Sequence, residues 1–120
     1  MRVVVAAGRV AGADLRVARA GEWRTNVGAG ATELPVRRLQ SEASELAVAA
    51  VDALGGDLFG VDLLPAPGGL VVLEVNGAVE FDGIYSFPGR DVYDDVAATL
   101  GLPELGLRAS EPAAIGGETP

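Results

Sequence analysis

The chain has 120 residues, enough for one domain of ordinary size, and 49% of them are hydrophobic, as in a folded soluble protein. Its formal net charge of −8 argues against nucleic acid as the main partner, because phosphate backbones bind basic surfaces. It lacks cysteine and histidine, which excludes disulfides, thiol nucleophiles and histidine-dependent triads. Any metal ion would therefore be held by oxygen atoms, which favours Mg²⁺ or Mn²⁺ over Zn²⁺.

The apolar runs of the chain are short. Residues 2–7, 58–64 and 70–75 are the main ones, and none approaches the roughly 18 residues needed to cross a bilayer. Met1 is followed by a strand-like run rather than by the pattern of a secretory signal peptide. These features predict a cytoplasmic protein with no membrane partner.

The first third of the chain is typical of extended structure. Residues 2–7 are rich in valine and predict a strand, residues 8–9 a tight turn, and residues 10–17 a second strand that completes a hairpin. Residues 22–26 predict a short extended piece, and residues 28–31 form a glycine-rich loop. That loop is either a backbone cradle for phosphate or an ordinary solvent-exposed loop.

The clearest helix signal covers residues 40–54. Its apolar residues recur at helical spacing and form one stripe: Ala43, Leu46, Ala47, Ala50, Val51 and Leu54. Acidic residues lie in its first turns, where the helix dipole favours them, and Gly55 and Gly56 end it.

The second half predicts a hairpin and a last helix. Residues 58–64 and 70–75 are the two strands, and the segment 65–69 is rich in proline and glycine, as in a turn. Asp91 is a suitable N-cap for a helix over residues 92–100. The element order predicts an α+β fold, with a mainly antiparallel sheet and the helices packed on one face.

Two carboxylates and an amide lie on the predicted hairpin of residues 58–75. If Leu64 pairs with Leu70, Asp62 and Glu74 are diagonal neighbours, and both project from the same face as Asn76. Two acids on one face repel each other unless a cation lies between them, which indicates a metal site.

The opposite face of this hairpin would then carry Val61, Leu63, Val71, Leu73 and Val75, free to pack on a helix. Geometry alone leaves a second interpretation open: the acids are the solvated face of an amphipathic hairpin.

Three short motifs follow one another along the chain: a strand pair at residues 1–10, GEWRTN at residues 21–26, and FGVDLL at residues 59–64 followed by LEVNG at residues 73–77. Their order and spacing resemble the RimK/LysX-type carboxylate–amine ligases of the ATP-grasp superfamily. The resemblance covers residues 1–101 and implies the C-terminal part of an ATP-grasp domain, without the N-terminal domain and the lid. Residues 102–120, rich in proline and glycine, are predicted to be a disordered tail.

This resemblance implies an ATP- and Mg²⁺-dependent ligase. Such enzymes phosphorylate a carboxylate with ATP, and an amine then attacks the acylphosphate to form an amide. The implied partners are ATP, an amino acid, here glutamate or a related one, and a carboxylate on a small molecule, peptide or carrier protein. The family also implies a homo-oligomer or association with the missing N-terminal half.

The resemblance assigns roles to individual residues. Asp62, Glu74 and Asn76 match the metal ligands, and Asn76 also lies beside the nucleotide. Arg24 and Asn26 match catalytic positions that face the phosphates and the acylphosphate.

Other matches are less specific. Arg2 and Arg16 match basic positions that bind nucleotide in the same cleft; alternatively they are ordinary strand charges. Arg24 could instead stack on Trp23. Glu80 and Phe81 resemble a pair that contacts the amine substrate; the other interpretation of Glu80 is a loop acid.

Two further hypotheses compete with the ligase. The chain has no lysine and lacks the nucleotide-binding lid, so it could be a truncated module that binds a partner without turnover. It could also be an unrelated α+β domain with a chance similarity. The first hypothesis is favoured because all three motifs occur in order.

Overall fold

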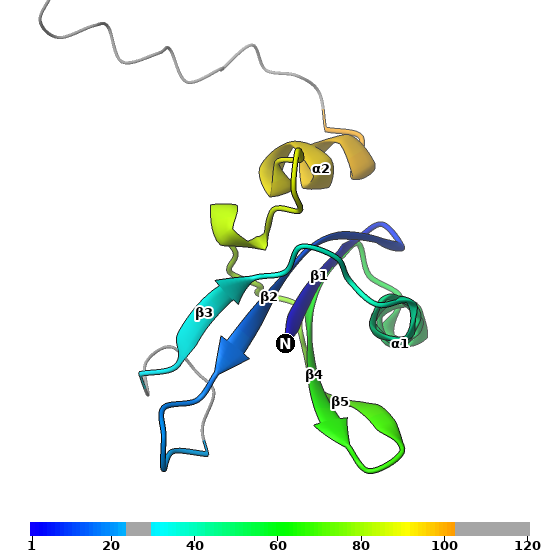
Figure 1. Cartoon of the computed structure of the whole chain (residues 1–120). Helices are drawn as coiled ribbons and strands as arrows, with labels where there is room; N and C mark the ends of the chain where they lie inside the picture. The colour runs from blue at the N-terminus through cyan, green and yellow to red at the C-terminus, as the bar shows by residue number, and fades with distance from the viewer. Residues whose placement is uncertain (24–29, 103–120) are drawn as a thin grey trace, which may run out of the picture.

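The computed structural model describes residues 1–23 and 30–102 of the chain. Figure 1 shows a sheet with one long helix, α1, against it and a shorter helix, α2, nearer the C-terminal end. In chain order the elements are β1 (Arg2–Ala6), β2 (Arg9–Val17), β3 (Thr32–Pro35), α1 (Ser41–Leu54), β4 (Leu58–Ala66), β5 (Gly69–Asn76), a 3₁₀ turn η2 (Gly83–Tyr85) and α2 (Val92–Thr99).

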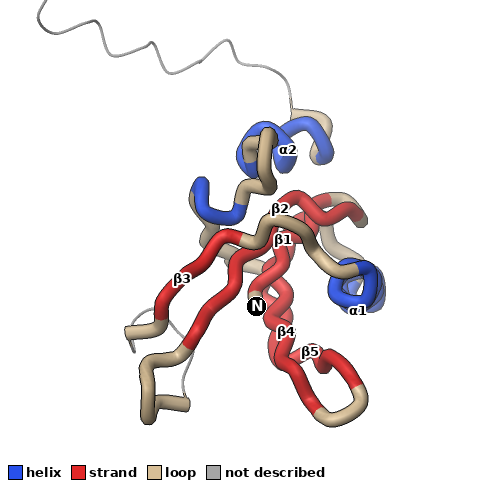
Figure 2. Tube along the Cα trace, in the orientation of Figure 1, coloured by secondary structure: helices blue, strands red, loops and turns tan. Residues whose placement is uncertain are grey.

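The five strands form one sheet in the order β3-β2-β1-β4-β5, and every neighbouring pair is antiparallel. Figure 2 shows the strands side by side, with the helices outside the sheet. The predicted α+β fold with a mainly antiparallel sheet is confirmed. Strand β3 and turn η2 were not predicted, because β3 has four residues without a clear alternation and depends on pairing with β2.

One face of the sheet packs against α1. Ala43, Ala47 and Val51 of the helix lie against buried residues of β1, β2 and β4, which include Val3 and Leu63. Gly55 ends the helix in a left-handed conformation, with φ 69°, and its N–H donates to the carbonyl of Val51. The predicted helix and its glycine stop are therefore confirmed, except that Leu54 at the end of the stripe is largely exposed.

The opposite face of the sheet packs against α2. Val4 and Ala6 of β1 form a second cluster with Val92 and Val96 of this helix. The prediction that both helices lie on one side of the sheet is wrong, because consecutive residues of β1 are apolar and such a strand is buried on both faces.

A glycine in β2 permits the close approach of α2 and η2. A Cβ atom added to Gly12 would lie 2.5 Å from the carbonyl oxygen of Tyr85 and 2.9 Å from a methyl group of Val92. The helix itself begins as predicted, since the side chain of Asp91 accepts hydrogen bonds from the N–H groups of Tyr93 and Asp94.

The β4–β5 hairpin differs in register from the prediction. Its turn is the residue pair 67–68, so Leu64 pairs with Val71 rather than with Leu70. A β-bulge follows at Leu73, because Leu63 pairs with Val72 while Asp62 pairs with Glu74.

These changes alter which apolar residues reach the core. Val61 and Leu63 are buried, and Val75 packs partly against them, as expected. Val71 and Leu73 are 44% and 64% exposed, contrary to the prediction, and Leu70 packs against the core instead.

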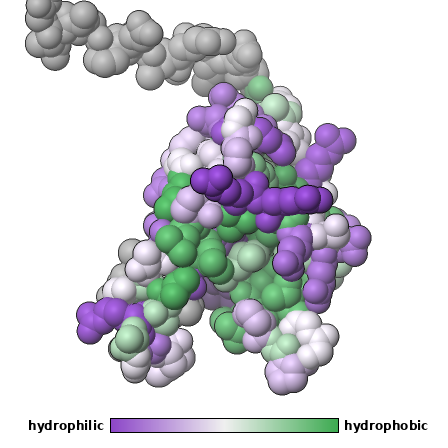
Figure 3. Space-filling model, in the orientation of Figure 1, coloured by the Kyte–Doolittle hydropathy of each residue, from purple (hydrophilic) through white to green (hydrophobic). Residues whose placement is uncertain are grey.

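Several large apolar side chains remain exposed on the sheet. On β2 and β3 they are Leu15, Val17 and Leu34, and on the β4–β5 hairpin they are Leu64, Val71, Val72 and Leu73. Figure 3 shows apolar surface across the middle of this view, with hydrophilic side chains around it.

No helix in the described part of the chain is long and apolar enough to cross a membrane. The predicted tail lies almost entirely in residues 103–120, outside the described residues.

Candidate active site

Charged residues of β1, β2 and β4 meet on the face of the sheet that carries α2. Strand β1 lies between the other two, so Arg2 faces Asp14 on one side and Asp62 on the other. The guanidinium of Arg2 donates from Nε to Oδ1 of Asp62 at 2.8 Å and from Nη2 to Oδ2 at 3.1 Å. This hydrogen-bonded pair raises the pKa of Arg2 above its ordinary value, although burial opposes the shift.

Asp14 is the one buried charged residue in the described part of the chain, and it is fully inaccessible to solvent. Its Oδ1 accepts the backbone N–H of Arg2 at 3.3 Å, and its Oδ2 accepts Nε of Arg16 at 3.2 Å. Arg16 in turn donates from Nη2 to the hydroxyl of Tyr85 at 3.0 Å. The buried carboxylate thus fixes the direction of the Arg16 side chain.

Ionisation in this network is governed by burial and by these partners. Burial would lower the pKa of Arg16, but Tyr85 and Asp14 together raise it. Burial raises the pKa of Tyr85, and the negative charge of Asp14 adds to the effect. Both groups therefore keep their ordinary neutral-pH forms, a charged guanidinium and a neutral phenol.

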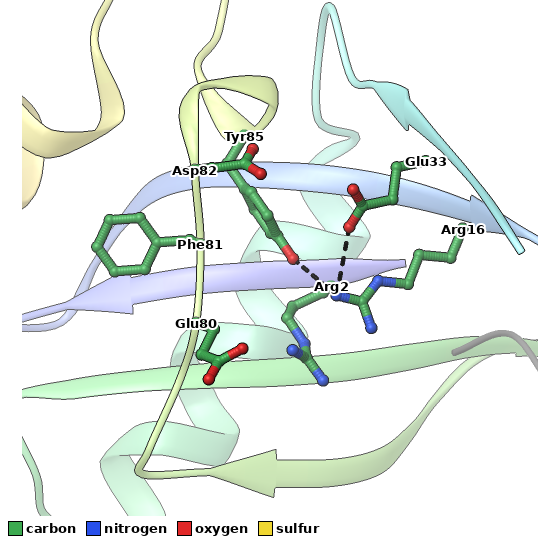
Figure 4. A pocket seen from close by; sticks show the side chains of 7 residues that line it. All are labelled: Arg2, Arg16, Glu33, Glu80, Phe81, Asp82 and Tyr85. Atoms are coloured by element: carbon green, nitrogen blue, oxygen red, sulfur yellow. Dashed lines mark hydrogen bonds and ion pairs between the residues drawn. The ribbon is translucent and has the colours of Figure 1, made fainter. Parts of the chain in front are cut away.

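A cavity of about 440 Å³ opens beside these arginines. Figure 4 shows the guanidinium of Arg16 directed toward Tyr85 and Glu33, with Arg2 beside it. The lining residues come from β1, β2, β3 and the segment after β5: Arg2, Arg16, Glu33, Glu80, Phe81, Asp82 and Tyr85.

The wall formed by the segment after β5 is held by α2. The hydroxyl of Tyr93 donates to the carbonyl of Phe81 at 3.2 Å, and the two rings lie 5.4 Å apart. The phenylalanine ring also meets Tyr85 edge-on, with 6.5 Å between ring centroids. Helix α2 therefore supports the cavity although it contributes none of the residues that line it.

Glu33 lies where negative charges accumulate. Burial raises its pKa, and the neighbouring Asp14 and Asp82 raise it further, while Arg16 at 3.6 Å lowers it. A positively charged group in the cavity would relieve this repulsion, so the acidic side of the cavity suits a cation.

The three residues predicted to bind metal lie together on this face of the sheet. Asp62 is directly opposite Glu74 rather than diagonal to it, and Asn76 pairs with Gly60 two residues further along. The amide oxygen of Asn76 accepts the N–H of Ala78 at 2.9 Å. Within the described ranges no cluster of three or more acidic, histidine or cysteine side chains could hold a metal. A metal here would therefore rely on two carboxylates and an amide oxygen.

Comparison with known proteins identifies a family that matches nearly all of the described chain. The chain matches the RimK-like ATP-grasp domain over residues 1–100. It belongs to the RimK-like ATP-grasp family. The matched range contains the five-stranded sheet and both described helices.

The curated relatives are much longer than this chain. It is 37% identical over 92 residues to a "Probable alpha-L-glutamate ligase" of Parasynechococcus marenigrum, which covers 77% of this chain and 20% of that protein. It is 37% identical over 92 residues to a "Probable alpha-L-glutamate ligase 2" of Pseudoalteromonas atlantica, covering 77% and 30%. A relative in Aeromonas salmonicida is 34% identical over 102 residues, covering 85% and 34%. The chain thus spans about a fifth to a third of the length of these relatives.

Five of the seven residues to which the resemblance assigns a metal, nucleotide or catalytic role lie in the described part of the chain. Arg2, Arg16, Asp62, Glu74 and Asn76 lie on one face of the sheet, and their roles stay predictions. Arg24 and Asn26 lie outside the described residues, and Trp23 before them is 86% exposed.

Sequence reasoning missed four residues of the site: Asp14, Glu33, Asp82 and Tyr85. One signal was present, since Asp14 and Arg16 are two apart on a strand and must share a face. The others come from β3, η2 and the segment before η2, whose positions depend on tertiary contacts.

Proposed function

We propose that this chain is the part of a RimK-like carboxylate–amine ligase that binds the metal and the nucleotide phosphates. The observation that carries the proposal is the convergence of Asp62, Glu74 and Asn76 with the arginines Arg2 and Arg16 on one face beside a cavity. Carboxylate and amide oxygens are the donors that Mg²⁺ and Mn²⁺ prefer, so the residues present fit a divalent ion. When bound, that ion would neutralise charge on the phosphates of ATP.

The arginines supply the remaining phosphate contacts. Arg16 is held by Asp14 and Tyr85, and the Nη1 group of its planar guanidinium carries two further N–H donors. Such donors suit the oxygens of a phosphate or an acylphosphate. Arg24 and Asn26, outside the described residues, would complete these contacts as catalytic groups.

The acidic side of the cavity is proposed to hold the amine substrate, and the side lined by Arg2 and Arg16 is proposed to face the nucleotide phosphates. Glu33, Glu80 and Asp82 give the cavity its acidic side, which suits the ammonium group of an amino acid. The reaction would join that amine to a carboxylate, with ATP converted to ADP and phosphate through an acylphosphate. The names of the relatives support glutamate as the amino acid.

Calorimetric titration with Mn²⁺ and ADP tests this proposal. The variant Glu74→Gln removes one proposed ligand and should weaken Mn²⁺ binding by at least about tenfold. Glu45→Gln, an exposed position on α1, is the matched control and should bind as the unmodified chain does. Equal affinities for the Glu74→Gln variant and the unmodified chain would refute the metal site.

A second candidate function is a module that associates with a partner and has no turnover of its own. The exposed side chains of Leu15, Val17 and Leu34, each between 38% and 46% accessible, favour it. Light scattering coupled to size exclusion distinguishes the two functions. A monomer that binds Mn²⁺ and ADP supports the ligase and not the partner-binding module.

A further inference from the structure

The ion pair between Arg2 and Asp62 occupies both oxygens of a proposed metal ligand. Nε of Arg2 binds Oδ1 and Nη2 binds Oδ2, so that the guanidinium fork matches the carboxylate edge. The pair is well shielded, with 13% and 23% of the two side chains exposed. A divalent ion at Asp62 must therefore compete with this guanidinium.

The positive charge of Arg2 also lies near Glu74, a second carboxylate. Glu74 lies directly opposite Asp62, where Cβ atoms of paired residues are about 5 Å apart, and no basic side chain in the described part of the chain pairs with it. The guanidinium thus provides the positive charge that two adjacent carboxylates require. Arginine keeps its proton at any physiological pH, so the ion pair with Asp62 cannot be lost by deprotonation. It breaks only when the Arg2 side chain moves away.

The structure offers Arg2 a second position. Its side chain already lines the cavity with Arg16, and the side-chain methylenes pass over Gly60, where an added Cβ would lie 3.4 Å from Cδ of Arg2. Rotation about the side-chain bonds would carry the guanidinium from Asp62 toward the cavity, where Figure 4 shows Arg16. A phosphate bound there would pair with the guanidinium of Arg2, while the metal ion would neutralise Asp62 in its place.

We propose that Arg2 and the divalent ion exclude each other at Asp62, and that the displaced Arg2 binds the nucleotide phosphates in the adjoining cavity. This inference rests on the proposed function. It makes metal and nucleotide binding cooperative, since each ligand favours the same movement of one side chain. In the absence of nucleotide, the arginine acts as a resident substitute for the metal ion.

The variant Arg2→Met tests the exclusion because its effects on the two ligands have opposite signs. Mn²⁺ alone should bind about tenfold more tightly, since it no longer displaces a guanidinium. ADP at saturating Mn²⁺ should bind about tenfold more weakly, since one phosphate contact is lost. Calorimetry gives both affinities, and electron paramagnetic resonance of Mn²⁺ reports the bound fraction independently.

Two further variants control for charge and folding. Arg9→Met removes the same charge at an exposed position of β2 and should change neither affinity by more than about twofold. Arg2→Lys keeps the charge and the fold but lacks the fork, and its Mn²⁺ affinity should lie between those of the unmodified chain and Arg2→Met.

The outcomes separate this inference from the proposed function. If Asp62→Asn abolishes Mn²⁺ binding but Arg2→Met and Arg2→Lys leave it unchanged, the metal site stands and the exclusion is refuted. If Mn²⁺ binds equally well with and without the Asp62 carboxylate, the proposed metal site fails, and the exclusion fails with it.

Discussion

The two faces of strands β1, β2 and β4 carry different chemistry on alternate residues of the same chain. Toward α1, Val3, Val5 and Leu63 form a continuous apolar layer that is almost fully buried. On the other side, Val4 and Ala6 pack against α2, and Arg2, Asp14 and Asp62 place charges beside that apolar contact. Both sets of side chains are held by the same backbone ladders.

This contrast shows how charged side chains can be held in place on a face that is only partly apolar. The α1 face carries the larger of the two buried apolar clusters, and the burial of apolar surface dominates stability. The charged face is positioned by the register of strands that the other face stabilises. Changes on the first face should therefore alter stability, and changes on the second should alter binding.

The largest expected effect is on the α1 face. Leu63→Ala should lower the free energy of unfolding by about 3 kcal/mol. The side chain of Leu63 is 2% exposed, so its truncation leaves a cavity in the core. Leu73→Ala on the neighbouring strand, where the side chain is 64% exposed, should cost less than about 0.5 kcal/mol. Urea denaturation measures both, and equal effects would contradict the conclusion that the buried side chains of the α1 face carry the stability.

The charged face should respond next most strongly at Asp14. Asp14→Asn places an amide N–H against Nε of Arg16 and removes a buried charge partner, which should cost about 2 kcal/mol. ADP affinity should fall as well, because Arg16 loses its orientation. The control is Asp52→Asn on the exposed side of α1. A loss of stability with unchanged ADP affinity would mean that Asp14 has no part in positioning Arg16.

The α2 side also contains an apolar contact, whose strength depends on a capped helix. Asp91→Ala removes the side chain that accepts from Tyr93 and Asp94, which should cost about 1 kcal/mol. Mn²⁺ affinity should remain unchanged because the proposed metal ligands lie on β4 and β5 and none of them belongs to the helix. Thermal unfolding with parallel calorimetry checks this; a weakened Mn²⁺ affinity would show that the helix and the metal site are coupled.

The smallest effect concerns Glu33 and depends on pH. Its pKa is raised in the folded chain, so the folded state binds the proton more tightly, and stability falls as pH rises from the ordinary pKa to the raised one. Glu33→Gln should therefore raise the stability at neutral pH by about 0.5 kcal/mol, with no gain below about pH 4. Denaturation at several pH values measures this gain, and a constant difference would contradict the electrostatic origin.

Much of the fold could be predicted from local patterns. The helix at Ser41–Leu54, its glycine stop and the N-cap at Asp91 depend on residues close in sequence, and all were correct. The face of α2 could not be predicted, because β1 is apolar on both sides and gives no preference. The register of β4 and β5 was wrong by one residue, since the turn is tighter than its composition indicates.

The candidate site also has a part that local sequence predicts and a part that depends on tertiary contacts. Asp62, Glu74 and Asn76 share a face because of strand alternation, which local sequence encodes. The partnership of Arg2 with Asp62 joins residues sixty positions apart, and pairing between β1 and β4 alone creates it. Domain boundaries and the roles of Arg24 and Asn26 remain predictions.

Leu73 is an extra residue in β5 that has no partner in β4, so the hairpin can tolerate a change in length at this position. Without Leu73, β5 would pair as a regular ladder and Glu74 would still face Asp62, because the residues before and after the bulge already have matching partners. Loss of this residue should therefore be tolerated, whereas loss of a residue between Glu74 and Asn76 would turn Asn76 to the other face. Homologous hairpins can accordingly differ in length on the turn side of Glu74, while the spacing from Glu74 to Asn76 cannot change without loss of the shared face.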